Sequence, residues 1–263
     1  PDRFSALLSL GGQFKGKVQG RFKNFWPNDF GKNRKVRGED DFELFSKFED
    51  EKIVKGFPGV WEHLVLDQVD FDVRSGEVHV VLGENGAGKS TLVKVLGGIY
   101  LPEAGTIRLD GQEVVIDSVQ TATRLGISYV HQELNLSDNL DIATNVFLGR
   151  EPREKSFLRL IDRKKLYKDT EQILQRIDMN YSPRLLVREL TIGGQQMIEI
   201  AKALSIAARI LIMDEPTSSL SRRETERLFR VIRARRSQGV SIIYISHRPG
   251  EVKEVDDRAM ALR

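Results

Sequence analysis

Residues 83–91 read GENGAGKST and fit the pattern G-x-x-x-x-G-K-[ST]. An apolar run typical of a strand, VHVVLG at 78–83, precedes them, and a helical stretch, TLVKVLGG at 91–98, follows them. Glycines let such a loop turn tightly and aim its N–H groups at a phosphate, and the lysine adds a positive charge. The sequence therefore predicts a strand, loop and helix unit that binds the phosphates of a nucleotide.

The expected contacts differ along this loop. Lys89 is predicted to reach the β- and γ-phosphates, and the Ser90 hydroxyl is predicted to bind Mg²⁺. We expect the loop to bind nucleotide through all of its residues: Gly83, Glu84, Asn85, Gly86, Ala87, Gly88, Lys89, Ser90 and Thr91.

A second candidate segment, RILIMDEP at 209–216, is an apolar strand that ends in two carboxylates. Adjacent acids after a strand are commonly no more than a loop edge. A phosphate loop in the same chain favours a catalytic interpretation, in which Asp214 holds Mg²⁺ and Glu215 polarises the attacking water.

From about residue 52, short β-rich runs alternate with helical patterns, which predicts an α/β domain with a largely parallel sheet. Asp110 and Gly111 are typical of a two-residue hairpin, so we expect an accompanying antiparallel piece. The remaining predicted strands are TIRL (106–109), ISYV (127–130), RILIMD (209–214) and VSIIYIS (240–246).

Strand signals fade between about residues 135 and 190, where we predict a helical subdomain. Asp162 is the expected N-cap of a helix over 163–178. The apolar face of that helix consists of Leu166, Thr170, Ile173, Leu174 and Ile177. Further on, Gly193 and Gly194 are expected to stand immediately before another helix, where backbone N–H groups can face an anion.

The composition, 40% hydrophobic and 30% charged, is that of an ordinary globular domain. No apolar run approaches the length of about 18–20 residues that a helix needs to span a bilayer. The segment SALLSL at 5–10 is too short to be the core of an export signal. The absence of cysteine excludes disulfides and cysteine-ligated metals and is compatible with a reducing compartment. With no export signal in the sequence, the cytoplasm is the expected compartment. The net charge of +3 is too small to imply a polyanionic partner for the whole chain.

Charge is nevertheless concentrated near the N-terminus, where residues 15–37 carry eight basic side chains and one acidic one, interleaved with aromatic residues. This pattern is compatible with a surface for nucleic acid or an anionic membrane. The interpretation that we favour is a solvated basic extension over 1–50, followed by the α/β domain over 51–263.

Five motifs in order resemble the nucleotide-binding domain of an ATP-binding cassette (ABC) protein over roughly residues 52–263: GENGAGKST, YVHQEL (129–134), LTIGGQQ (190–196), ILIMDEPTSSLS (210–221) and YISHR (244–248). The resemblance implies the P-loop NTPase fold of ABC ATPases, with ATP and Mg²⁺ as cofactors. GENGAGKSTLVKVLGGIY, NVFLGREP (145–152) and QQMIEIAKALS (195–205) further resemble ATPase subunits of bacterial and archaeal monosaccharide importers. Those subunits carry two cassettes in tandem, and this chain is similar to the first, which implies a fragment ending at RAMALR.

The same resemblance assigns roles to further residues. Gln132 matches the glutamine that touches Mg²⁺ and senses the membrane subunit, His247 matches the switch histidine at the γ-phosphate, and Phe57 matches the aromatic that stacks on adenine. The ABC signature, which meets the γ-phosphate held by a second cassette, falls on Leu190, Thr191, Ile192, Gly193 and Gly194. Here the family's serine is Thr191, its first glycine is Ile192 and its closing glutamine is Gly194. Ser221 stands where many members have aspartate.

The resemblance implies a peripheral protein at the cytoplasmic face of the membrane that hydrolyses ATP to drive import of a small solute, above all a monosaccharide. Its implied partners are a second cassette, integral-membrane permease subunits and, indirectly, an extracytoplasmic solute-binding protein, with no specific nucleic acid. Three alternatives stay open: a nucleoside importer, a soluble ABC ATPase that acts on nucleic acid or ribosomes, and a chain that is silent without its partner.

Overall fold

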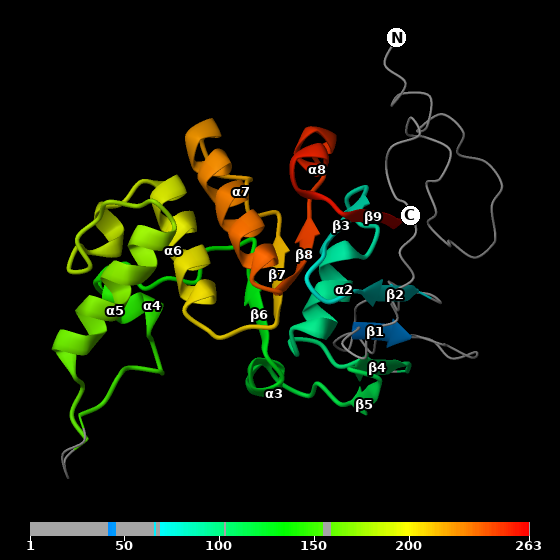
Figure 1. Ribbon diagram of the computed structural model, residues 1–263, viewed down its shortest axis with the longest axis horizontal. Helices are drawn as coiled ribbons and strands as arrows, with labels where there is room; N and C mark the ends of the chain where they lie inside the picture. The colour runs from blue at the N-terminus through cyan, green and yellow to red at the C-terminus, as the bar shows by residue number, and fades with distance from the viewer. Residues whose placement is uncertain (1–41, 46–65, 67–68, 103, 155–158, 263) are drawn as a thin grey trace, which may run out of the picture. The chain divides into compact units, whose positions relative to one another are not determined.

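The structure is a computed structural model that describes residues 42–45, 66, 69–102, 104–154 and 159–262 (Figure 1). Phe57 and all of the predicted basic extension except residues 42–45 lie outside these ranges. The expected adenine contact and the boundary at residue 51 therefore stay predictions.

A five-stranded parallel sheet forms the centre of the domain, in the order β6-β7-β8-β3-β9. Its strands are β3 (Val78–Gly83), β6 (Ile127–Val130), β7 (Ile210–Asp214), β8 (Ser241–Ile245) and β9 (Arg258–Leu262). Every residue of β7 and β8 is buried, as expected of apolar and β-branched runs that are covered on both faces. The predicted parallel sheet is confirmed, and β9 is an addition that the sequence reading missed.

Alternate side chains of each strand enter two separate cores. On β8, Ile242 and Tyr244 join the core beneath the later helices, whereas Ile243 and Ile245 join the core on the opposite face. The first core contains buried side chains of α7 and α8, and the second contains buried side chains of α2 and α3, so these helices cover opposite faces of the sheet. The bounds of the helices that flank the sheet are α2 (Lys89–Leu96), α3 (Val119–Arg124), α6 (Ile192–Leu204), α7 (Arg222–Ser237) and α8 (Pro249–Val255).

A four-stranded sheet in the order β2-β1-β4-β5, antiparallel in each of its pairings, accompanies the parallel one. Its strands are β1 (Phe42–Phe45), β2 (Asp70–Val73), β4 (Thr106–Leu109) and β5 (Gln112–Val114). The predicted hairpin is confirmed, because Asp110 and Gly111 have φ values of 53° and 72°, the pair of positive angles that a tight hairpin requires. Strand β1 comes from upstream of residue 51, so this sheet takes one strand from the segment that we expected to be extension.

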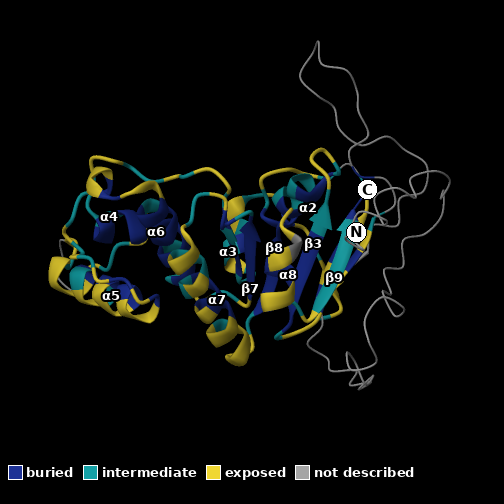
Figure 2. Cartoon of the chain, turned by 90° about the horizontal axis from the view of Figure 1, so that it is seen from above, coloured by how far each residue is buried: buried dark blue, intermediate teal, exposed yellow. Residues whose placement is uncertain are grey.

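The predicted helical subdomain contains α4 (Ile142–Val146), α5 (Arg163–Arg176) and the 3₁₀ turn η1 (Val187–Glu189). Asp162 caps α5 by accepting a hydrogen bond from the Lys165 N–H, and the predicted apolar face of this helix is buried. Figure 2 shows the opposite face of α5 exposed. None of the helices in the described part of the chain has the length and apolarity that a membrane span requires.

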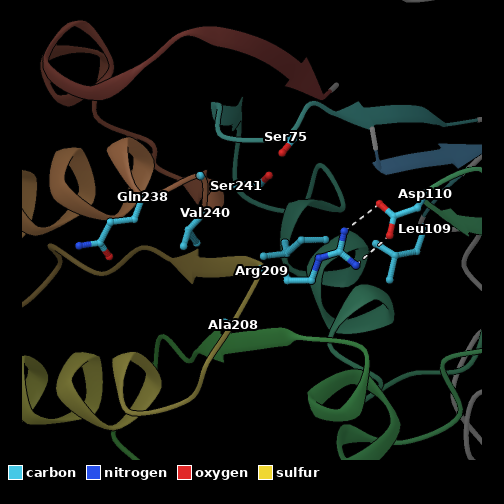
Figure 3. A pocket seen from close by; sticks show the side chains of 10 residues that line it. Ser75, Leu109, Asp110, Ala208, Arg209, Gln238, Val240 and Ser241 are labelled. Atoms are coloured by element: carbon cyan, nitrogen blue, oxygen red, sulfur yellow. Dashed lines mark hydrogen bonds and ion pairs between the residues drawn. The ribbon is translucent and has the colours of Figure 1, made fainter. Parts of the chain in front are cut away.

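A hollow of about 160 Å³ lies at the amino ends of β7 and β8, the edge of the sheet away from the phosphate loop (Figure 3). Arg209 crosses it to make two contacts of 2.8 and 2.9 Å with the Asp110 carboxylate. This ion pair links the turn between β4 and β5 to the start of β7. The Arg209 guanidinium and the Asp110 carboxylate are hydrogen-bond partners across the hollow, so these two groups have a structural role there. The hollow is separate from the candidate site described below.

Candidate nucleotide site

The predicted site residues follow four strands of the parallel sheet. The phosphate loop follows β3, Glu215 follows β7, His247 follows β8 and Gln132 follows β6. Because the carboxyl ends of parallel strands meet at one edge, these segments share the edge where open α/β sheets bind ligands.

The phosphate loop ends in a cradle of positive charge at the start of α2. Gly88 is the N-cap, with a φ of 89° that favours glycine, and no side chain caps the first N–H groups of the helix. Lys89 is 5% exposed, and its Nζ donates hydrogen bonds to the carbonyls of Gly83 at 2.8 Å and Glu84 at 2.9 Å. A buried ammonium and free N–H groups fit a phosphate, which would take over part of the bonding of Lys89.

Two side chains that carry oxygen, Ser90 and Asp214, lie beside this positively charged loop. Ser90 Oγ lies 3.5 Å from Oδ1 of Asp214, and Tyr129 donates its hydroxyl to Oδ2 at 3.0 Å. Burial raises the pKa of the Asp214 carboxyl, and the two hydroxyl contacts partly oppose that effect. A hydroxyl and a carboxylate are hard oxygen donors of the kind that Mg²⁺ prefers, so the predicted pair fits the ion.

Glu215 and His247 meet across the ends of two adjacent strands. Oε1 of Glu215 lies 3.1 Å from Nδ1 of His247, with the two side chains 15% and 48% exposed. The Glu215 N–H donates to the Ile245 carbonyl at 3.1 Å, and its φ is 46°, in the left-handed region that non-glycine residues seldom adopt. The contact places a carboxylate and an imidazole within reach of one another at the sheet edge.

Gln132 lies outside this cluster of side-chain contacts. It is exposed, and among the described residues no hydrogen bond joins it to Ser90 or Asp214. Its predicted metal contact therefore stays a prediction.

The glycine pair does not precede a helix, as the sequence reading expected, but forms part of its first turn. The Thr191 hydroxyl accepts a hydrogen bond from the Gly194 N–H at 3.1 Å, so α6 begins at Ile192. A Cβ on Gly193 would stand 2.5 Å from Oε2 of Glu224, so the end of that side chain would have to move to admit a larger residue. Gly193 therefore lies close against the Glu224 carboxylate of α7.

The other signature residues face in different directions. Leu190 is buried, whereas Ile192 is 65% exposed at the start of the helix. Downstream, Ser221 caps α7 in a reciprocal arrangement with Glu224. Serine and aspartate are both favoured N-caps, so the departure at Ser221 keeps the helix start that an aspartate would provide.

Tyr129 is the site residue that sequence reasoning missed. It belongs to YVHQEL, but its contact with Asp214 spans 85 positions of the sequence. The sequence offered one indication of this role, a polar aromatic residue near the end of a predicted strand. In the structure that strand is β6, which pairs with β7.

A glycine-rich loop between a parallel strand and a helix, beside an aspartate that ends a neighbouring strand, defines a phosphate-loop nucleoside-triphosphate-binding domain. Comparison with known proteins gives the family. The chain belongs to the ABC transporter family, whose model matches residues 66–218, more than half of its length.

Similar sequences include two bacterial import proteins. The chain is 52% identical over 213 residues to the ribose import ATP-binding protein RbsA 2 of Streptomyces coelicolor, with 81% of this chain and 40% of that protein covered. It is 49% identical over 211 residues to a putative ribose/galactose/methyl galactoside import ATP-binding protein of Burkholderia ambifaria, with 80% and 40% covered. The chain thus spans about two fifths of the length of these curated relatives.

Solved structures of ATP-binding cassettes share the fold. One nucleotide-free cassette from an ABC transporter aligns with a TM-score of 0.69 at 20% identity, covering 84% of this chain and 86% of that one. A dimeric post-hydrolysis cassette bound to ADP and phosphate has the same TM-score and identity, covering 85% and 94%. The expected ABC ATPase fold is confirmed.

Proposed function

We propose that this chain is a cassette that binds and hydrolyses ATP to drive the import of a small solute, a monosaccharide, through a membrane permease. The observation that carries the proposal is the meeting of the Lys89 cradle, the Ser90 and Asp214 oxygens and the Glu215 and His247 pair at one sheet edge. The names of the ribose and galactose import relatives support the choice of a sugar.

In this proposal each group has a distinct task. Lys89 and the first N–H groups of α2 bind the phosphates, while Ser90 and Asp214 would hold Mg²⁺, which would neutralise negative charge on the nucleotide. Glu215 accepts a proton from the attacking water. His247, held against Glu215, orients that carboxylate and contacts the terminal phosphate.

A second cassette is the partner that the signature supports. The first turn of α6 lies against α7, away from α2, which carries this chain's own phosphate loop (Figure 1). Its exposed Thr191 and Ile192 are therefore available to the γ-phosphate of another cassette, and dimeric cassettes among the fold's solved members support such pairing.

The remaining partners complete an importer. Permease subunits anchor the cassette peripherally at the cytoplasmic face, and a solute-binding protein acts indirectly from the outside. Exposed apolar side chains just after α2 are suited to such an anchor: Ile99, Tyr100 and Leu101.

The test is Mg²⁺-dependent ATP hydrolysis by the purified chain as a function of its own concentration. A specific activity that climbs with concentration supports pairing of two copies, each completing the other's site. A flat, negligible rate despite measurable ATP binding would mean that the signature needs a different partner cassette.

Glu215→Gln sharpens this test, because it keeps the shape of the side chain and removes the base. We expect ATP binding to persist while turnover falls by about a hundredfold or more. The matched control is Glu171→Gln on the exposed face of α5, which should leave turnover unchanged. Undiminished hydrolysis by the Glu215 variant would remove Glu215 from the role of base.

A further inference from the structure

A buried carboxylate links the two segments that carry Glu215 and His247. Glu251 lies in the first turn of α8 and is 9% exposed. Neither Glu215 nor His247 touches it among the described contacts, but a residue two positions after Glu215 and both chain neighbours of His247 do. A buried carboxylate is stable only where donors surround it, so the identity of those donors is informative.

One donor comes from the segment after Glu215. The hydroxyl of Thr217 lies 2.8 Å from Oε1 and 2.9 Å from Oε2 of Glu251, and is shared between the two oxygens. Thr217 is itself buried and begins TSSLS, the stretch that runs to Ser221 at the N-cap of α7.

The other donors come from β8 and the residues on either side of His247. Ser246 donates its hydroxyl to Oε2 at 2.9 Å, and Arg248 approaches Oε1 at 3.3 Å. Tyr244 donates to Oε2 at 2.9 Å from within β8. Burial, reinforced by the charge of Glu251, raises the pKa of the Tyr244 hydroxyl, which therefore remains a donor across the working pH range.

We infer that Glu251 is a positioning residue, which clamps the segment after Glu215 to the segment that contains His247 and so fixes the 3.1 Å contact between those two side chains. The catalytic consequence rests on the proposed function. The reason is geometric: Thr217 stands two residues after Glu215, while Ser246 and Arg248 flank His247, so both sides of the contact are tied to one carboxylate.

Packing of β7 against β8 alone would not provide this restraint. The strands end at Asp214 and Ile245. Beyond them, the described contacts that join the two segments without Glu251 are a backbone hydrogen bond from the Glu215 N–H to Ile245, a long one of 3.4 Å from the Arg248 guanidinium to the Thr217 carbonyl, and the Glu215 and His247 contact itself. Glu251 adds the hydroxyls of Thr217 and Ser246 to this connection. A displacement of about 1 Å in a catalytic group can lower a rate by a hundredfold, so such a restraint has a measurable effect.

Hydrogen exchange of the whole chain tests the clamp without requiring hydrolysis. Thr217→Val keeps the shape of the side chain and removes its hydroxyl from Glu251. We expect the amides of residues 246–252 other than Pro249, on the far side of the clamp, to exchange about tenfold faster, and Thr217→Ser to restore protection. Unchanged protection of residues 246–252 in the valine variant would overturn the inference.

The matched control is Thr170→Val, because Thr170 is also buried and its hydroxyl donates to the Leu166 carbonyl at 2.8 Å within α5. It should leave residues 246–252 as protected as before. If Thr217→Val unfolds the chain, Ser246→Ala probes the clamp from the other side, and faster exchange of residues 217–221 is then the expected result. Unchanged exchange of those residues would overturn the inference.

Steady-state hydrolysis then separates positioning from simple stabilisation. Thr217→Val should lower kcat between about tenfold and a hundredfold and leave the KM for ATP within about twofold, because the phosphate cradle does not touch the clamp. Faster exchange with an unchanged kcat would overturn the positioning role. A wild-type chain that neither binds nor hydrolyses ATP at any concentration would count against the proposed function, while the exchange experiment would still decide the clamp.

Discussion

The two regions that this chain offers to a nucleotide are held in different ways. At the carboxyl edge of the parallel sheet, the polar side chains already have partners. Lys89 donates hydrogen bonds to carbonyls of its own loop, Tyr129 donates to Asp214, and Glu215 contacts His247. At the start of α6, the signature is fixed by a helix cap and by the close approach of Gly193 to Glu224, and Ile192 points outward.

The two regions therefore differ in how far their functional groups are held in place before a nucleotide binds. The sheet edge is preorganised, because its charged groups already have the hydrogen-bond partners that hold them in place. The start of α6 is shaped by packing on one side and left open on the other. A region built in that way is suited to completing a site on another molecule.

The largest effect should come from breaking the sheet edge at Lys89. Lys89→Ala removes the buried charge at the end of the phosphate loop, and we expect ATP affinity to fall by about a hundredfold or more. Equilibrium binding of a fluorescent ATP analogue measures the change. Lys165→Ala is the control, since its ammonium is exposed and pairs with Asp169 on α5. Unchanged affinity in the Lys89 variant would count against the phosphate-loop assignment.

The second effect should separate the two regions. Ile192→Glu places a carboxylate where we propose that the γ-phosphate of another cassette docks, so the concentration-dependent part of hydrolysis should fall by about thirtyfold. ATP binding should stay as it was, and the melting temperature should not fall, because an acidic residue suits the first turn of a helix.

The comparison for that variant is Leu160→Glu, a substitution of another exposed apolar side chain, in the helical subdomain. It should leave the concentration dependence as it is. If Ile192→Glu also has no effect on that dependence, the start of α6 is not the surface through which copies pair.

A smaller effect should follow from Tyr129→Phe. The variant removes a donor from Asp214, whose pKa burial already raises, and the pKa should rise further. Since Mg²⁺ binds the deprotonated carboxylate, Mg²⁺-dependent ATP binding should weaken a few-fold, and more so as the pH falls. Titrations at several pH values measure this.

Tyr167→Phe is the matched control for that experiment, because its hydroxyl donates to Asp141 in the helical subdomain at 3.0 Å. It should not change the Mg²⁺ dependence. A Tyr129 variant with the same pH dependence as the wild type would show that the hydroxyl does not tune Asp214.

The smallest effect concerns the buried side of α6. Burial raises the pKa of Glu199, and its Oε2 has no hydrogen-bond partner among the described residues. Its ionised form therefore costs stability above the folded pKa, and this cost disappears below the unfolded pKa. We expect Glu199→Gln to stabilise the chain by on the order of 1 kcal/mol near neutral pH, with no gain at about pH 3.

Urea unfolding at several pH values checks this result, with the exposed Glu171→Gln as the variant that should show no such trend. Equal or lower stability of the Glu199 variant at neutral pH would mean that Lys202, 3.7 Å away, compensates the buried charge.

The sequence predicted elements well where one physical signal dominated. Continuous β-branched runs predicted β7 and β8, because strands covered on both faces have no other composition available. It missed β1, β2 and β9, which become strands through their neighbours. It also misplaced the start of α6, since two adjacent glycines argue against a helix, and the cap by Thr191 that begins this helix is seen only in the structure.

The sequence by itself determined the chemical groups of this protein and the family to which it belongs, because the motif residues and their order are written along the chain. Only the tertiary structure decided which groups meet. Tyr129 and Asp214 are 85 positions apart, and Thr217 and Glu251 are 34 apart. Their contacts depend on the order of the parallel strands in the sheet, which the side-chain periodicity of a single strand does not encode.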